Sequence, residues 1–144
     1  MNAGRSTRAS SCRRTGLILA VAVLPWISSC GSVGPDAASA ATVAVAFHKA
    51  LAGSDGAAAC ALLAPETAAE VETTAERACP EAVVDQDVPD AAAVEVSQTF
   101  GRSAQVVMDG DVLFLAIFDG RWRITAAGCQ ANGAQPYDCQ VKDG

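Results

Sequence analysis

The chain has 144 residues and a formal net charge of −6, and 51% of its residues are hydrophobic. The charge is uneven: four arginines and no acid precede residue 30, whereas residues 30–144 hold 6 basic and 16 acidic side chains, a balance of −10. This length allows one domain. The acidic body argues against a nucleic-acid-binding protein, because phosphates require a positive surface.

Residues 1–29 have the pattern of a secretion signal. The four arginines precede the apolar stretch 16–26, which is too short to span the roughly 30 Å of a membrane's hydrocarbon layer as a helix. The pair Arg13-Arg14 leaves the twin-arginine export route open beside the general one. We therefore expect the chain to be exported.

The end of this signal, Ile27-Ser28-Ser29-Cys30, resembles the bacterial lipobox. In a lipobox the small side chains admit the signal peptidase and the cysteine receives a diacylglyceryl group, which holds a protein on a membrane more persistently than a single acyl chain does. The alternative is an ordinary signal that is cleaved near residues 38–40. We expect lipidation of Cys30, with residues 30–37 as a tether at the outer face of the cell membrane.

The part between residue 38 and Pro89 has helical patterns, with apolar side chains at helical spacing. We expect the third helix to break near Thr73-Thr74, because both residues are β-branched and Thr73 with Glu76 matches a capping box for a new start. Pro80 indicates a further helix start. The predicted helices cover residues 38–52, 56–63, 66–73 and 80–86.

The part after Pro89 alternates apolar and polar residues, which predicts strands. Asp109-Gly110 and Asp119-Gly120 are typical two-residue hairpin turns. The predicted strands cover residues 94–100, 104–108, 111–118 and 121–128.

The two turns fix the strand register, and the register predicts which face of the sheet is buried. A three-residue loop at 101–103 places Val94, Val96 and Phe100 on that same face, and we expect this loop rather than a two-residue one. The predicted core face consists of Ala104, Val106, Leu113, Leu115, Ile117, Trp122 and Ile124.

The opposite face of the predicted sheet is half apolar and carries two arginines. One interpretation is a solvated surface on which the arginines lie over Phe114 and Phe118. The other is a docking surface for a partner, formed by Phe114, Phe118, Arg121 and Arg123. The whole face consists of Gln105, Val107, Val112, Phe114, Phe118, Arg121, Arg123 and Thr125.

Four cysteines remain after the signal and the lipobox, and an even number in an exported chain indicates disulfides with three possible pairings. We favour the two local pairs, Cys60–Cys79 and Cys129–Cys139, each worth about 3 kcal/mol in the chain-entropy model. A four-cysteine zinc site is the alternative, but the chain has no C-x₂-C pair. We expect no metal and no cofactor.

Helices followed by a four-stranded antiparallel meander predict an α+β domain over residues 38–144, with helices in 38–86 on one face of a curved sheet in 94–128 and a disulfide-closed tail in 129–144. Segments of this region resemble a family of small actinobacterial secreted lipoproteins. The resemblance implies a nuclear-transport-factor-2-like fold, the cone-shaped fold that includes ketosteroid isomerase. No activity follows from it. The segments that carry it are 57–65, 111–115, 122–129 and 136–139.

Few residues in the predicted domain are suited to catalysis. His48 is the one histidine, and a structural or surface role suits it better than that of a general base. Tyr137 falls in the C-terminal tail, which it is expected to fasten, and no acid lies on the predicted core face. The acids of the helical part form no calcium loop.

These observations predict a non-catalytic lipoprotein of the cell envelope that binds a protein partner or a small apolar ligand at the membrane surface. The binding site is expected either on the Phe114, Phe118, Arg121 and Arg123 face or inside the cone. The alternative is a small-molecule enzyme of isomerase or cyclase type that uses a pocket in the cone. Converging polar side chains in such a pocket would favour the enzyme, and a filled apolar core would favour the binding protein.

Overall fold

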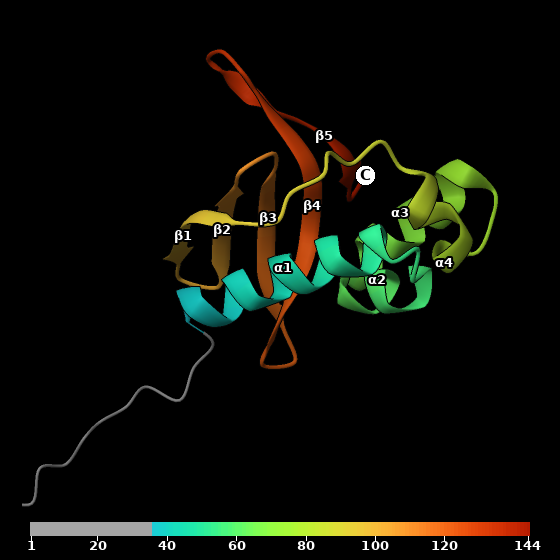
Figure 1. The fold of residues 1–144 in the computed structure, drawn as a ribbon, viewed down its shortest axis with the longest axis horizontal. Helices are drawn as coiled ribbons and strands as arrows, with labels where there is room; N and C mark the ends of the chain where they lie inside the picture. The colour runs from blue at the N-terminus through green and yellow to red at the C-terminus, as the bar shows by residue number, and fades with distance from the viewer. Residues whose placement is uncertain (1–35) are drawn as a thin grey trace, which may run out of the picture. The chain divides into compact units, whose positions relative to one another are not determined.

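The structure is a computed structural model, and it describes residues 36–144. The predicted signal peptide, the lipidation site at Cys30 and most of the tether lie outside these residues. Four α-helices and a short 3-10 helix come first, and five strands follow (Figure 1). The chain is therefore an α+β protein, as predicted. No helix in the described part is long and apolar enough to cross a membrane.

The helix α1, Ala37–Ala52, begins at a capping box in which Asp36 accepts a hydrogen bond from the N–H of Ser39 and Ser39 accepts one from the N–H of Asp36. The backbone hydrogen bond from Ser39 lowers the pKa of Asp36 from its ordinary value of 3.8. The buried indole of Trp122, on the sheet, donates to the carbonyl of Asp36. The start of α1 is thereby fixed against the sheet.

The helices α2, Gly56–Leu62, and α4, Cys79–Ala82, pack closely and are joined by the Cys60–Cys79 disulfide, with 6.0 Å between the two Cα atoms. A Cβ atom on Gly56 would lie 1.7 Å from the carbonyl oxygen of Pro80, so this approach requires glycine. The predicted pairing is present, and the helix start predicted at Pro80 is confirmed.

The helix α3, Pro65–Ala75, continues through Thr73-Thr74 and ends one residue later, so the break predicted near these residues is confirmed, whereas the new helix start predicted at Thr73 is wrong. The two threonine hydroxyls bond to the carbonyl of Ala69 and the side chain of Glu70, so β-branching is tolerated inside the helix. Glu76 does not begin a new helix but ends α3, with a left-handed φ of 50°. This reversal brings the chain back to Cys79, and the short helix η1, Val83–Asp85, follows α4.

The sheet is an antiparallel meander in the order β1 to β5, with one more strand than predicted. The segment 129–144, predicted as a tail, contains the end of β4 and all of β5. Cys129 and Cys139 pair across these two strands and form the predicted disulfide. The strands are β1 Val94–Phe100, β2 Ser103–Met108, β3 Val112–Phe118, β4 Arg121–Asn132 and β5 Gln135–Lys142.

The predicted register of the central strands is confirmed. Val106 pairs with Leu113, Ala104 and Ile124 both pair with Leu115, and Ile117 pairs with Trp122. These side chains form the buried face, although Ile117 is only partly buried.

The register predicted for β1 is wrong. Phe100 pairs with Ser103, so the loop holds only Gly101 and Arg102, and Gly101 has the positive φ of 65° that such a tight turn requires. Val96 and Phe100 consequently point away from the core and are 44% and 62% exposed. A bulge after Val94 returns that residue to the core side, where it packs against the buried cluster.

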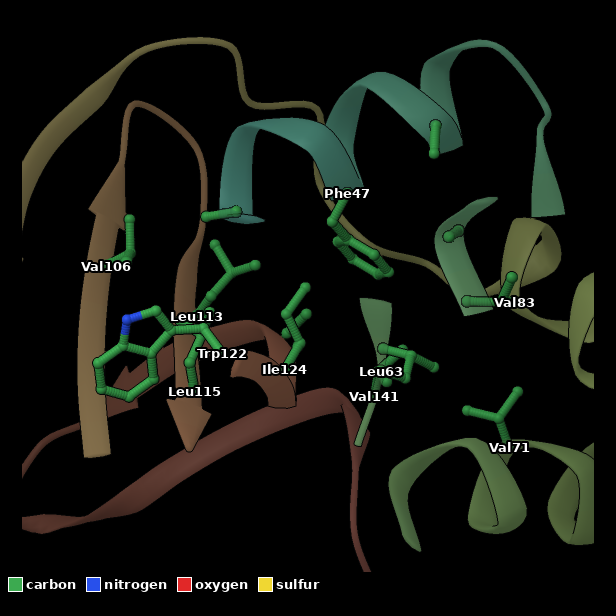
Figure 2. Close-up of a cluster of buried hydrophobic side chains, with 14 of the residues drawn as sticks. Phe47, Leu63, Val71, Val83, Val106, Leu113, Leu115, Trp122, Ile124 and Val141 are labelled. Atoms are coloured by element: carbon green, nitrogen blue, oxygen red, sulfur yellow. The ribbon is translucent and has the colours of Figure 1, made fainter. Parts of the chain in front are cut away.

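The core lies between α1 and the buried face of the sheet, and α1 crosses β1, β2 and β4 (Figure 1). Phe47, which is fully buried, points from α1 into a cluster that includes Leu63 and Ile124 (Figure 2). The alanines of α1 allow the helix to lie close to the strands. Apolar side chains therefore fill the space under α1.

Candidate functional site

The four residues of the predicted partner face, Phe114, Phe118, Arg121 and Arg123, lie on the side of the sheet opposite the core. Phe114 on β3 is half-buried and contacts Tyr137 edge to face, with 5.1 Å between the ring centres. The hydroxyl of Tyr137 lies 3.3 Å from the side-chain nitrogen of Gln105, which donates to it. Tyr137 therefore fastens β5 to the outer face of the sheet, which agrees with its predicted fastening role.

The two arginines of this face have different surroundings, and the interpretation that both shield the aromatic rings is wrong. Arg123 donates from Nη1 to the carbonyl of Ala61 in the last turn of α2, where carbonyl groups lack helical partners. This hydrogen bond holds the Arg123 side chain against α2. Arg121, which pairs with Phe118, is exposed and has no hydrogen-bond or ion-pair partner among residues 36–144.

Two residues that the sequence placed in the core enlarge this face, namely Val96 and Phe100. No acid occurs among the residues of β1–β4 that pair on it. We define the outer face by these residues together with Tyr137. They are Val96, Gln98, Phe100, Ser103, Gln105, Val107, Val112, Phe114, Ala116, Phe118, Arg121 and Arg123.

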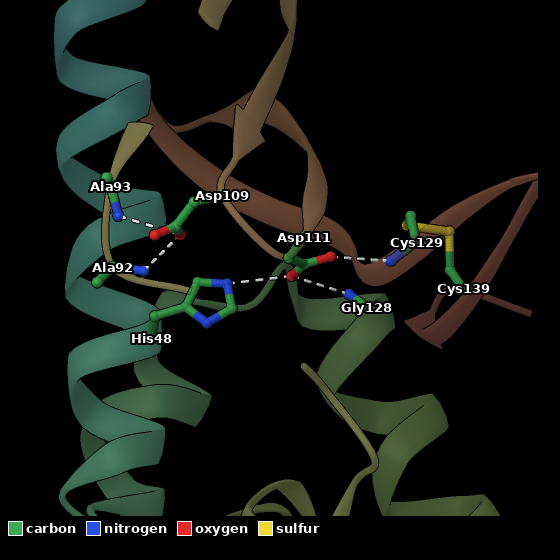
Figure 3. Close-up of polar contacts among 8 residues, drawn as sticks. All are labelled: His48, Ala92, Ala93, Asp109, Asp111, Gly128, Cys129 and Cys139. Atoms are coloured by element: carbon green, nitrogen blue, oxygen red, sulfur yellow. Dashed lines mark hydrogen bonds and ion pairs between the residues drawn. A yellow bond between two sulfur atoms is a disulfide. The ribbon is translucent and has the colours of Figure 1, made fainter. Parts of the chain in front are cut away.

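A second polar site was missed by sequence reasoning and lies where α1 meets the turn between β2 and β3. Asp111 immediately precedes β3, and its side chain is fully buried. Its carboxylate accepts hydrogen bonds from Nε2 of His48 at 3.0 Å and from the backbone N–H groups of Gly128 and Cys129 at 3.1 and 3.0 Å (Figure 3). The sequence predicted no acid on the core face, and the buried Asp111 corrects that prediction.

The position of Asp111 follows from local backbone geometry. Gly128 has a φ of 66°, which turns its N–H toward the carboxylate, and a Cβ atom there would lie 2.9 Å from Gln140. His48 is 6% exposed, so it is a buried histidine and not a surface one, and it has a specific hydrogen-bond partner in Asp111.

Asp109, two residues earlier, is exposed and fastens the segment that leads into β1. Its Oδ1 accepts the N–H of Ala92 at 2.8 Å and that of Ala93 at 3.2 Å. The hydrogen bond from Ala92 is the main cause that lowers the pKa of Asp109 from its ordinary value of 3.8, and the hydrogen bond from Ala93 contributes in the same direction. Asp109 and Asp111 thus hold two different segments from one turn.

A hollow of about 420 Å³ opens beside this network, between the end of α1 and the segment before β1. At Gly110 the backbone lies so close to the carbonyl oxygen of Asp90 that a Cβ atom would not fit. The residues that line the hollow combine two acids with apolar side chains. The lining residues are His48, Leu51, Ala52, Val88, Asp90, Ala91, Ala92 and Asp109.

The chemistry open to this arrangement is limited. A carboxylate that orients an imidazole is a common element of acid–base sites, but the cysteines nearest to it, Cys129 and Cys139, are bonded to each other. Among the described residues no group of three or more histidine, cysteine, aspartate or glutamate side chains is placed to hold a metal ion. The arrangement is suited to hydrogen bonding and charge recognition.

Replacing Asp109 with alanine should destabilise the chain near neutral pH and make little difference in acid. A carboxylate with a lowered folded pKa stabilises the folded state above its ordinary pKa, and this contribution is lost as the pH falls through the folded value. Urea denaturation of both proteins at about pH 6 and about pH 2.5 measures the effect. An equal difference at the two pH values would contradict the assignment.

No protein-family model matches the chain, and neither a curated protein nor a solved structure is significantly similar to it.

Proposed function

We propose that the chain is a lipoprotein of the cell envelope that is held at the outer face of the membrane by a diacylglyceryl group on Cys30 and binds a protein partner without catalysis. The lipobox at 27–30 and the acidic body support the location. The curved antiparallel meander under α1 supports the nuclear-transport-factor-2-like fold and the relation to the small actinobacterial lipoproteins.

The observation that carries the binding function is the concentration of exposed apolar side chains on the outer face. Of the four large apolar residues that are exposed in the described part, Val96, Phe100 and Tyr137 lie on this face, and only Val45 lies elsewhere. Grouped apolar surface on an exported domain is typical of an interaction site. Aromatic residues and arginine are also the types that dominate binding energy at interfaces.

The charge of the outer face indicates the chemistry of the partner. None of the residues that define this face is an acid, and Arg121 has no partner among residues 36–144, although residues 30–144 as a whole have a balance of −10. A complementary surface therefore combines apolar side chains with at least one carboxylate. We propose an apolar and acidic protein segment as the occupant.

The enzymatic alternative, an isomerase or cyclase with its site inside the cone, has weaker support. Such a site needs polar side chains that converge on an interior pocket. In the described part the space under α1 holds Phe47, Leu113 and Ile124, and Tyr137 lies on the opposite face of the sheet. The binding function is therefore the one that we propose.

Replacing Cys30 with alanine should release the protein from the membrane. Cells that express the wild type should retain it in the membrane fraction, with a diacylglyceryl group on Cys30 by mass spectrometry, because two acyl chains anchor persistently. The variant Cys12→Ala, a cysteine inside the signal, serves as the control and should behave as the wild type. Retention of Cys30→Ala in the membrane fraction would overturn the anchor.

A photoreactive phenylalanine analogue at position 100 tests the outer face in intact cells. It should give a discrete adduct with another protein, mapped to a segment with apolar and acidic side chains, whereas the same analogue at Val45, the exposed residue on α1, should not. Arg121→Glu should lower the adduct yield about tenfold, because like charges oppose association. An adduct of the chain with itself, or equal yields from both positions, contradicts the proposal.

A further inference from the structure

We propose that the hollow beside His48 binds a small organic cation, namely a primary or secondary ammonium group with a short apolar substituent. This site lies at the end of α1 and does not depend on the outer face or on its partner.

The hydrogen bonds of Asp111 place the ring proton of His48. The N–H groups of Gly128 and Cys129 can only donate, and each bonds to one carboxylate oxygen of Asp111. An ionised carboxylate is only an acceptor, so the third contact requires Nε2 of His48 to be a donor. In a neutral imidazole, a proton on Nε2 leaves Nδ1 with an unshared electron pair, so Nδ1 is then an acceptor.

Nδ1 is not sealed from solvent, although the side chain of His48 is only 5% exposed. Figure 3 shows this nitrogen on the edge of the ring that points away from Asp111. Nδ1 has no hydrogen-bond partner among residues 36–144, and in that part no side-chain nitrogen or oxygen atom is both sealed from solvent and unpartnered. His48 lines the hollow, and we therefore assign its solvent-accessible Nδ1 to that space.

The remaining walls define the class of ligand. Leu51 and Val88 supply apolar surface, Asp90 and Asp109 supply negative charge, and no lysine or arginine lines the hollow. A ligand that satisfies all three features donates a hydrogen bond to Nδ1, carries a positive charge and has an apolar body. The volume of about 420 Å³ is within the range of small-molecule sites.

Other classes of ligand fit less well. An anion would face two carboxylates and an acceptor nitrogen. A quaternary ammonium ion has no N–H group to donate to Nδ1. A metal ion would need further ligands, and the described residues provide no group of three. A protonated primary or secondary amine fits because it carries a positive charge and donates a hydrogen bond to Nδ1.

The full-length chain in detergent micelles, labelled with ¹⁵N-histidine and carrying no histidine tag, allows a direct test, because His48 is the one histidine in the chain. The ¹⁵N spectrum should show a ring protonated at Nε2. Titration with benzylamine should shift the Nδ1 resonance to saturation. Benzyl alcohol, which has the same ring without the charge, should bind about tenfold more weakly or worse, and benzoate should not bind.

Two matched variants separate the charge of this hollow from the charge of the whole protein. Asp90 makes no side-chain hydrogen bond in the described part, so Asp90→Asn is expected to leave the fold intact and to weaken benzylamine binding about three- to fivefold. Asp138→Asn removes the same charge from a different hollow, lined by Gln130, Asn132 and Gln140, and should leave the affinity unchanged.

Three results would overturn the proposal. One is a ring protonated at Nδ1, and another is a benzoate response as large as that of benzylamine. The third is a Zn²⁺-induced shift of Nδ1 that excludes benzylamine, which would make the hollow a metal site. None of these readouts depends on the outer face, so a failure here leaves the proposed protein partner untouched.

Discussion

Replacing Asp111 with alanine should lower the free energy of unfolding by about 3–5 kcal/mol. The substitution leaves three donors without an acceptor, namely Nε2 of His48 and the N–H groups of Gly128 and Cys129, in a place that solvent does not reach. Each unsatisfied buried group costs about 1–3 kcal/mol, and relaxation of the site recovers part of the sum. Urea denaturation followed by fluorescence of the buried Trp122 gives the value.

Two further variants show whether the loss comes from these contacts. Asp109→Ala removes an exposed carboxylate from the same turn and should cost clearly less. The double variant His48→Phe, Asp111→Ala removes one of the stranded donors, so its loss should be smaller than the sum of the two single losses. A loss below about 1 kcal/mol for Asp111→Ala, or strict additivity, would show that the network does not stabilise the fold as described.

The central part of the sheet was predictable because two-residue turns leave little freedom. Once Asp109-Gly110 and Asp119-Gly120 are accepted as turns, the pairing of β2, β3 and β4 follows residue by residue, and the buried face follows from the pairing. Local chemistry fixes these contacts, so one sequence suffices to find them. Each disulfide likewise joins two cysteines that are close in the sequence, with separations of 19 and 10.

The error in β1 arose from the assumption that large apolar side chains belong in the core. That assumption required a three-residue loop, although Gly101 already supplied the positive φ of a two-residue turn. Val96 and Phe100 are exposed instead, and they enlarge the surface that we propose as the interface. Apolar residues at binding surfaces break the rule by which a core is predicted.

The fifth strand carried a signal that the sequence reasoning did not use. Asn132 pairs with Gln135, so the turn consists of Gly133 and Ala134, and Gly133 at its first position has the positive φ of 62° that favours glycine there. Most side chains near that turn are exposed, and Pro136 weakens the strand pattern, so apolar alternation gave no indication. Turn chemistry was the better guide here.

The pairing of His48 with Asp111 could not be predicted from one sequence. The two residues are 63 positions apart, and no local pattern links them. From the sequence alone, Asp111 looks like an exposed polar residue that follows the Asp109-Gly110 turn. Only the packing of α1 against the sheet and the positive φ of Gly128 convert it into a buried acceptor.

Replacing both Cys60 and Cys79 with alanine should lower the free energy of unfolding by about 3 kcal/mol, the second large effect that we expect. The disulfide closes a loop with a sequence separation of 19, and its loss restores the entropy of that loop in the unfolded chain. Cys79 is also buried, so the smaller side chain leaves space in the core. Denaturation in urea under oxidising conditions measures the change.

The Cys129→Ala, Cys139→Ala variant is the matched comparison, because its loop has a sequence separation of 10 and the chain-entropy model gives it nearly the same value. The two pairs differ in what they join. Cys60–Cys79 connects α2 to α4, which no hydrogen-bond ladder holds, whereas Cys129–Cys139 lies between strands that already pair. Loss of the first pair should therefore also increase proteolysis within residues 76–92, and equal proteolysis there in both variants would show that backbone packing at Gly56, not the disulfide, holds the helices together.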